Sequence, residues 1–195
     1  MSVIGVCGPN AIGKTTFAYR MLDRYGPNLR AVIADNQWET HSCADEDHVR
    51  VRGWKGTTEE KETLVRQHQA SDEVVVIDSV RTTALNFFSP TDPVIIVTCT
   101  WQKMGEVLRA RCLKNNKKFR ADYWDEWKLG YESSKRYLNF AAKNLSPDQY
   151  KVFEIEDQAR DWPAVDAYFG TLYRRLYNAI LRQKREAREG VDLLT

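Results

Sequence analysis

The stretch Gly8–Thr16 reads GPNAIGKTT and fits the spacing G-x-x-x-x-G-K-T. It follows the short apolar run Val3–Cys7 and leads into a segment, 14–25, whose apolar residues recur at helical spacing. Two glycines at this spacing let a loop curl so that successive backbone N–H groups point inward, toward the positive end of the following helix. An anion of phosphate size fits such a loop. The order of strand, loop and helix therefore predicts a phosphate-binding site.

The residue types of this loop predict a nucleoside triphosphate as its ligand. An ammonium at Lys14, on an exposed loop, is expected over the β- and γ-phosphates, and the hydroxyl of Thr15 on a magnesium ion. The alternative is a glycine turn with a surface lysine. The residues expected to bind ATP are Gly8, Asn10, Ala11, Ile12, Gly13, Lys14, Thr15 and Thr16.

The length and composition are those of one ordinary globular domain spanning residues 1–195. Of these residues, 43% are hydrophobic and 29% are charged, and the net charge is +2. That charge argues neither for nor against a nucleic-acid partner. A monomer and a homodimer are both compatible with these numbers.

The four cysteines are scattered without C-x-x-C pairing, and Cys7 and Cys99 lie in apolar runs. This usage predicts a reduced, cytoplasmic chain with buried thiols and no zinc site. The sequence shows no signal-peptide pattern and no apolar run of membrane-spanning length, so no membrane association is expected.

Five short apolar runs predict the strands of a parallel sheet, because near-continuous Val/Ile character suits strands that are covered on both faces. Helical segments lie between most of them, which favours an α/β domain built from βαβ units. The expected strands are Val3–Cys7, Ala31–Ala34, Val74–Ile77, Val94–Cys99 and Lys151–Ile155. The expected helices are 14–25, 57–70, 82–88, 102–117, 122–145 and 163–188. The segment 36–60 lacks clean periodicity over most of its length, so it is expected to be an irregular, acceptor-binding insertion.

The third apolar run ends in an acid, Asp78, which is expected to hold magnesium or its water shell beside Thr15. The alternative role of Asp78 is to cap the following helix. Three residues later, Arg81 is a candidate to grip a substrate phosphate with two parallel hydrogen bonds. As an isolated arginine it would instead lie on the surface.

A basic segment over residues 109–122 predicts a small lid. Arg109 and Arg111 are followed by three lysines and then by Arg120. A closing lid has to bring positive charge to the transferring phosphoryl group, and Arg111 and Arg120 are the candidate catalytic cations. The alternative is a solvated helix face.

Together these features resemble the nucleoside monophosphate kinase superfamily, most closely phage deoxynucleoside monophosphate kinases and archaeal adenylate-kinase-like proteins. The resemblance rests on the glycine-rich loop, the D-x-x-R that begins at Asp78, the R-x-R at 109–111 and the R-x-D at 120–122. It implies an α/β, three-layer P-loop kinase fold: a five-stranded parallel sheet of order 2-3-1-4-5, helices on both faces and a small lid. It also implies Mg²⁺ and ATP, and a substrate between segment 36–60 and the lid. The chain departs from the pattern at Asn86, where relatives often carry an acid, and in its Trp-rich segments.

The phosphate acceptor depends on whether a proton has to be removed. A nucleoside monophosphate offers an anionic oxygen and needs no base, whereas a hydroxyl benefits from a carboxylate. Asp35 follows the second apolar run, where small-molecule and polynucleotide kinases resembling this fold place such a base; otherwise it is a turn residue. Trp38 and Trp54, with Arg52, are candidates to stack a base and hold its phosphates, or else to pack the insertion onto the sheet.

Three functions therefore remain open. The favoured one is an ATP-dependent phosphotransferase that phosphorylates a nucleoside or deoxynucleoside monophosphate. The alternative is a kinase of a hydroxyl group, with Asp35 as general base, on a small metabolite or on nucleic acid (a strand end or a modified base such as 5-hydroxymethyluracil). A non-catalytic nucleotide switch is weakest, because a switch needs no basic lid and the guanine motif N-K-x-D is absent.

Near the C-terminus, an apolar stripe at helical spacing runs from Val165 to Ile180. Six cations occupy other positions of the same predicted helix, between residues 174 and 188. A solvated helix end is the default interpretation. A contact with nucleic acid or another partner is the alternative.

Overall fold

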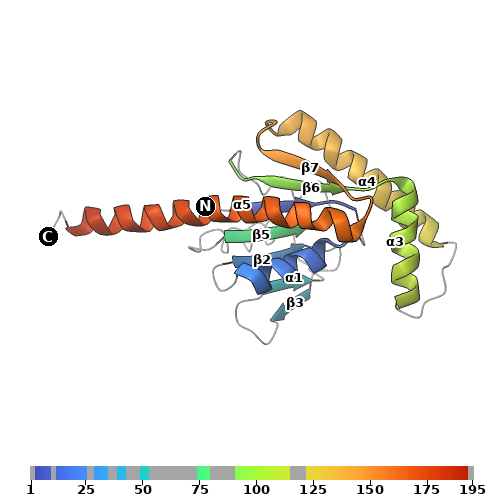
Figure 1. The fold of residues 1–195 in the computed structure, drawn as a ribbon, viewed down its shortest axis with the longest axis horizontal. Coiled ribbons are helices and arrows are strands. Elements are labelled where there is room, and N and C mark those ends of the chain that lie inside the picture. Colours follow the sequence, from blue (N-terminus) through green and yellow to red (C-terminus); the bar gives the residue numbers. More distant parts are fainter. Residues whose placement is uncertain are drawn as a thin grey trace.

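The computed structural model describes residues 3–9, 12–25, 29–34, 39–42, 49–52, 74–79, 91–114 and 122–192. Within these ranges a main sheet lies among four helices, one of which extends far beyond the sheet (Figure 1). The strands of the main sheet are β1 (Val3–Cys7), β2 (Leu29–Ala34), β5 (Val74–Ser79), β6 (Val94–Thr98) and β7 (Tyr150–Glu154). The helices are α1 (Lys14–Tyr25), α3 (Trp101–Lys114), α4 (Asp122–Asn144) and α5 (Gln158–Asp192).

The main sheet has the strand order β2-β5-β1-β6-β7, and every neighbouring pair is parallel. Its two central registers place Val6 opposite Asp78 and Cys7 opposite Ile96. Parallel strands end at the same edge of a sheet, so the segments that follow β1, β5 and β6 leave from one side of the molecule.

The predicted fold was wrong in its number of strands. The described part of the chain forms seven strands in two sheets rather than five strands in one. Numbered among themselves along the chain, the five strands of the main sheet have the order 2-3-1-4-5. The additional strands, β3 (Glu39–Ser42) and β4 (Val49–Arg52), form an antiparallel pair. They lie inside the segment predicted to be irregular, where the sequence contains no near-continuous apolar run. β3 (ETHS) is polar throughout, and β4 (VRVR) has an arginine at every second position.

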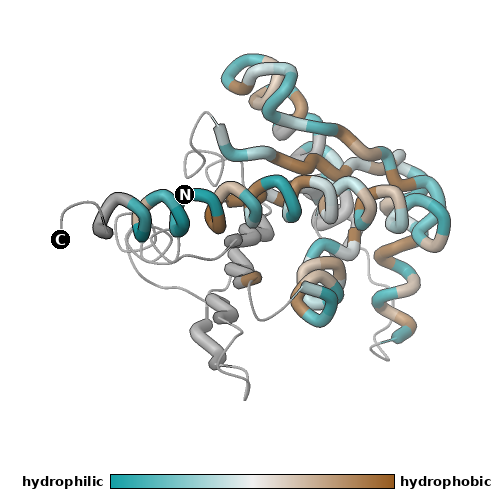
Figure 2. Tube along the Cα trace, turned by 60° about the vertical axis from the view of Figure 1, so that its left-hand side comes forward, coloured by the Kyte–Doolittle hydropathy of each residue, from teal (hydrophilic) through white to brown (hydrophobic). Residues whose placement is uncertain are grey.

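Side chains of the central strands pack into two separate hydrophobic cores, one on each face of the sheet, because successive residues of a strand point to opposite faces. Ile4 and Val6 of β1 pack with Phe17 of α1 and Phe169 of α5 on one face. On the other face, Cys7 packs with residues of β6 and α4, which include Ile96 and Ala141. Figure 2 shows the strands as the most hydrophobic part of the trace. The sheet is thus held between α1 and α5 on one side and α4 on the other.

Helix α5 begins five residues earlier than the predicted 163–188 and is 35 residues long. Its start is fixed by the carboxylate of Asp157. Asp157 Oδ1 accepts hydrogen bonds from the backbone N–H groups of Ala159 and Arg160, at 2.8 and 3.0 Å. Such capping satisfies donors that a helix N-terminus leaves without partners. Among the helices that the structure describes, none has the length and apolar character needed to cross a membrane.

Candidate phosphate-binding site

The G-x-x-x-x-G-K-T loop connects the carboxyl end of β1 to the first turn of α1. Helix α1 begins at Lys14, and the backbone N–H of Phe17 donates to the carbonyl of Gly13 at 2.9 Å. The loop therefore lies at the edge of the sheet where the parallel strands end, with the positive end of a helix behind it. Asn10 and Ala11, which were predicted to bind ATP, lie outside the described residues.

Both glycines of the loop occupy places that a side chain could not share. A Cβ atom at Gly8 would lie 2.5 Å from the carbonyl oxygen of Val97 in β6, so the start of the loop runs against the neighbouring strand. Gly13 has a φ of +115°, and a Cβ there would lie 3.2 Å from the ring of Trp162. The glycine spacing therefore follows from close packing and from backbone conformation.

Lys14 differs from its predicted exposed position. Lys14 is only 5% exposed, and its Nζ donates a hydrogen bond to the carbonyl oxygen of Pro9 at 2.9 Å. A buried ammonium needs hydrogen-bond acceptors, and this one finds an acceptor in the loop itself. The bond holds the ammonium across the loop, where an anion cradled by backbone N–H groups would meet it.

The two threonines that follow differ in exposure. Thr15 is half-buried in the first turn of α1, whereas Thr16 is exposed. The structure thus places Thr15 next to the buried Lys14 and Thr16 on the outer surface of the helix.

The backbone of Asp78 lies at the same sheet edge as the loop. In the register of β1 and β5, Asp78 is opposite Val6, and Val6 stands two residues before Gly8. The hydroxyl of Thr15 and a carboxylate at Asp78 are oxygen donors of the kind that Mg²⁺ prefers. The donor set and the glycine cradle therefore fit a magnesium-bound phosphate chain.

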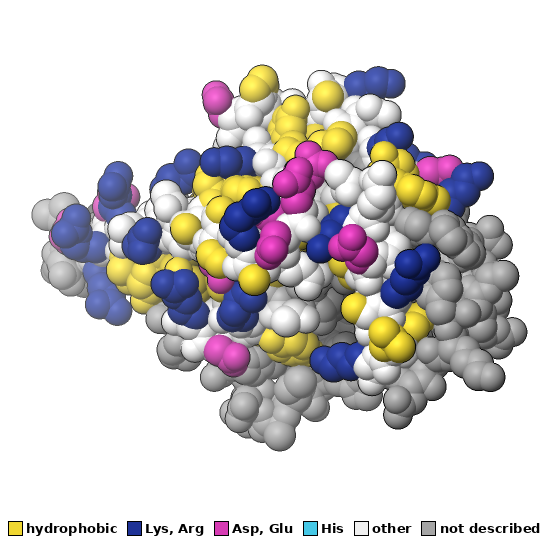
Figure 3. Space-filling model, turned by 45° about the vertical axis from the view of Figure 1, so that its right-hand side comes forward, with side chains coloured by type: hydrophobic (Ala, Val, Ile, Leu, Met, Phe, Trp, Pro, Cys, Tyr) yellow, Lys and Arg dark blue, Asp and Glu magenta, His cyan; other side chains and the backbone are white. Residues whose placement is uncertain are grey.

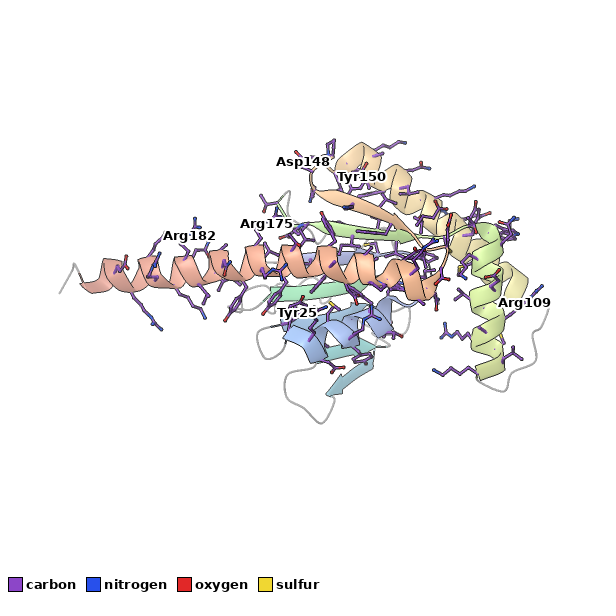
Figure 4. All side chains as sticks on the ribbon, viewed as in Figure 1. Tyr25, Arg109, Asp148, Tyr150, Arg175 and Arg182 are labelled. Atoms are coloured by element: carbon purple, nitrogen blue, oxygen red, sulfur yellow. The ribbon has the colours of Figure 1, made fainter. Side chains whose placement is uncertain are left out.

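The remaining predicted site residues are only partly placed. Arg111 is exposed in the last turn of α3, and Arg52 ends β4 opposite Glu39. In Figure 4, Arg109 lies on the side of α3 that faces away from the sheet. The predicted lid over residues 109–122 is described only as the end of α3 and the first residue of α4. Asp35, Trp38, Trp54, Arg81 and Arg120 lie outside the described residues.

Sequence reasoning missed the support beneath the loop. Trp162 of α5 stacks on Phe17 of α1, with ring centroids 5.3 Å apart and planes inclined by 29°. Beside them, Arg20 of α1 forms an ion pair with Asp166 of α5 at 2.5 Å. The available signal was spacing: Trp162 stands three residues before Val165 and extends the apolar stripe by one turn.

The electrostatics of this edge argue against a cysteine nucleophile. Cys99 follows β6, and burial, assisted by the charge of Glu154, raises the pKa of its thiol to about 11. Since the thiolate is the reactive form, this thiol is inert near neutral pH.

At the start of α5, the hydrogen bond from Arg160 and bonds from backbone N–H groups hold the pKa of Asp161 well below its usual range. The carboxylate of Asp161 therefore stays ionised near neutral pH.

Replacing Gly13 with alanine is expected to destabilise the fold by about 1–3 kcal/mol, because its φ of +115° is rare for L-residues and the Trp162 ring leaves little room. Urea unfolding would measure this loss. The matched control is Thr16→Ala, an exposed position on α1 where the change should stay within about 0.5 kcal/mol. Equal stability of Gly13→Ala and the parent chain would mean that this backbone conformation is not required.

A scan against protein-family models finds no match for this chain, and a search of curated proteins also finds none. The chemistry of the site is therefore inferred from the loop and its surroundings.

Proposed function

We propose that the chain is an ATP-dependent phosphotransferase that phosphorylates a nucleoside or deoxynucleoside monophosphate. The observation that carries the proposal is the buried ammonium of Lys14, bonded to the Pro9 carbonyl across a loop between a strand and a helix N-terminus. An ammonium buried in this setting suits the charge of a phosphate chain. A surface lysine on an ordinary glycine turn would extend into solvent.

The proposed catalysis is electrostatic and positional. The backbone N–H groups of the loop and of the first turn of α1 would hold the phosphates of ATP. Lys14 would leave the Pro9 carbonyl and donate to oxygens of the transferring group, where charge builds up in the transition state. Because the stacked pair of Trp162 and Phe17 supports the loop, these donors are held in place before the substrate binds.

Thr15 and Asp78 are the proposed magnesium ligands. When bound, the ion neutralises charge on the phosphate oxygens and fixes their orientation. Arg81, two residues after the end of β5 in the sequence, is the residue proposed to hold the acceptor phosphate. With an anionic acceptor oxygen, no residue has to remove a proton.

A reducing, cytoplasmic setting is part of the proposal. Cys7, Cys99 and Cys112 are buried and form no disulfide, as expected of a chain that does not depend on disulfides. Cys43 lies outside the described residues.

Removal of the proposed metal ligands is expected to weaken the magnesium dependence of ATP binding. In Thr15→Ala and in Asp78→Ala, calorimetric titration with ATP should give affinities with and without Mg²⁺ that differ less than in the parent chain. Ser146→Ala is the matched control, since it deletes an exposed hydroxyl between α4 and β7, outside the loop. Tight ATP binding that ignores Mg²⁺ in the parent and both variants would contradict the assigned ligands.

A further inference from the structure

The last third of α5 projects beyond the sheet. Its last buried side chain is Ile180, which is 8% exposed, and residues 181–189 are all exposed. Figure 1 shows this part of the helix passing the amino ends of the strands, at the edge opposite the phosphate-binding loop. Figure 2 shows it as mostly hydrophilic. Packing of an apolar face is the usual source of helix stability, and the exposed residues of this segment provide little of it. The segment is therefore a candidate for binding a partner.

Cations are dense along the projecting part of α5 and the two turns that precede it. We call residues 174–189 the basic arm. It holds six cations and two acids, whereas the whole chain has a net charge of only +2. The cations are Arg174, Arg175, Arg182, Lys184, Arg185 and Arg188. Figure 3 shows Lys and Arg side chains gathered over this end of the molecule.

The arginines of the arm share a face. Arg182, Arg185 and Arg188 are spaced by three, which places them on neighbouring turns of one side of the helix. In Figure 4, Arg175 and Arg182 point to the same side of α5, as their seven-residue spacing requires. Within the described part of the arm, the ion pair between Arg185 and Glu189 is loose, at 3.9 Å. The guanidinium groups are therefore presented to solvent.

We propose that the basic arm binds the phosphate backbone of a nucleic acid. Exposed guanidinium groups in a row match the regular negative charge of that backbone and can donate to phosphate oxygens in pairs. An anionic membrane fits less well, since a helix lying on lipid needs an exposed apolar face. The apolar stripe of α5 is buried as far as Ile180, and beyond it the stripe continues with Gln183 and Ala187. This inference does not rest on the phosphotransferase proposal, because the arm and the loop lie at opposite edges of the sheet.

The test is the salt dependence of binding to a fluorescein-labelled 20-base-pair DNA duplex by the full chain without nucleotide. The parent chain should bind, with affinity falling steeply as salt rises. The arm variant Arg182→Gln/Arg185→Gln/Arg188→Gln should bind about 10²-fold more weakly at 0.1 M salt, and its log–log salt slope should be less steep by about three. Glutamine is a good helix former, so circular dichroism should show unchanged helix content.

The matched control is Lys128→Gln/Arg136→Gln/Lys143→Gln on α4, which removes three exposed cations and includes one loosely paired arginine, Arg136 with Glu132 at 3.8 Å. It changes the net charge equally and should leave affinity and slope nearly unchanged. The proposal would be overturned if the parent failed to bind the duplex at 50 mM salt. Equal losses in the two triple variants, or binding to phosphatidylserine vesicles but not to the duplex, would also overturn it.

Discussion

Substituting Lys14 with alanine is expected to reduce phosphoryl transfer by about 10³-fold or more, because a desolvated cation aimed at the transferring group contributes several kcal/mol to the transition state. The ammonium is buried and bonded to the Pro9 carbonyl, so no bulk solvent would replace it. Steady-state turnover with the preferred acceptor measures the loss. Near-normal turnover in Lys14→Ala would remove the phosphotransferase proposal altogether.

Because Lys14 is buried, its replacement could also affect stability, and a second variant separates the two effects. Lys14→Met keeps the apolar stem and deletes only the charge. It should unfold in urea close to the parent chain and yet be as inactive as Lys14→Ala. An inactive Lys14→Met protein with parental stability assigns the loss to the ammonium, whereas an active one contradicts the role given to it.

Substituting Arg81 with alanine is expected to raise the apparent KM for a monophosphate acceptor roughly ten- to a hundredfold, since a charge-assisted pair of hydrogen bonds to the acceptor phosphate is lost. The turnover number at saturating acceptor should change far less. Initial rates across a series of acceptor concentrations separate KM from kcat.

Asp35→Asn provides the opposing test. With a monophosphate acceptor no proton is removed, so this variant should keep most of its kcat. With a hydroxyl acceptor, loss of a general base should cost roughly 10²–10⁴-fold in kcat, and Arg81→Ala should be nearly silent. A polymeric acceptor would add steep salt dependence. A large rate loss in Asp35→Asn beside a silent Arg81→Ala would replace the proposed acceptor with a hydroxyl.

Apolar runs identified the strands of the main sheet because burial on both faces leaves a strong compositional signal. Val3–Cys7 and Val94–Thr98 are fully buried along their length, and both were visible in the sequence. The strands β3 and β4 left no such signal, since ETHS and VRVR read as polar insertion. Their register, with Glu39 opposite Arg52, depends on a pairing between segments and cannot be found from either segment alone.

At the site, the sequence predicted the loop but not its packing. The spacing of Gly8, Gly13 and Lys14 followed from the chemistry of phosphate binding, whereas the burial of Lys14 depends on where the Pro9 carbonyl points. Similarly, the contact of Trp162 with Gly13 joins residues far apart in the chain. Contacts of this kind arise from the topology that brings α5 back against α1, which no local pattern encodes.

The central claim is tested most directly by transfer of label from γ-³²P-ATP, with Mg²⁺, to a panel of nucleoside and deoxynucleoside monophosphates, oligonucleotides and modified DNA. The parent chain should convert at least one monophosphate to its labelled diphosphate, and Lys14→Met should convert none. Label on none of the acceptors, or an equal yield with Lys14→Met, would contradict phosphoryl transfer at this loop. Label confined to the nucleic acids would retain the loop and overturn the proposed acceptor.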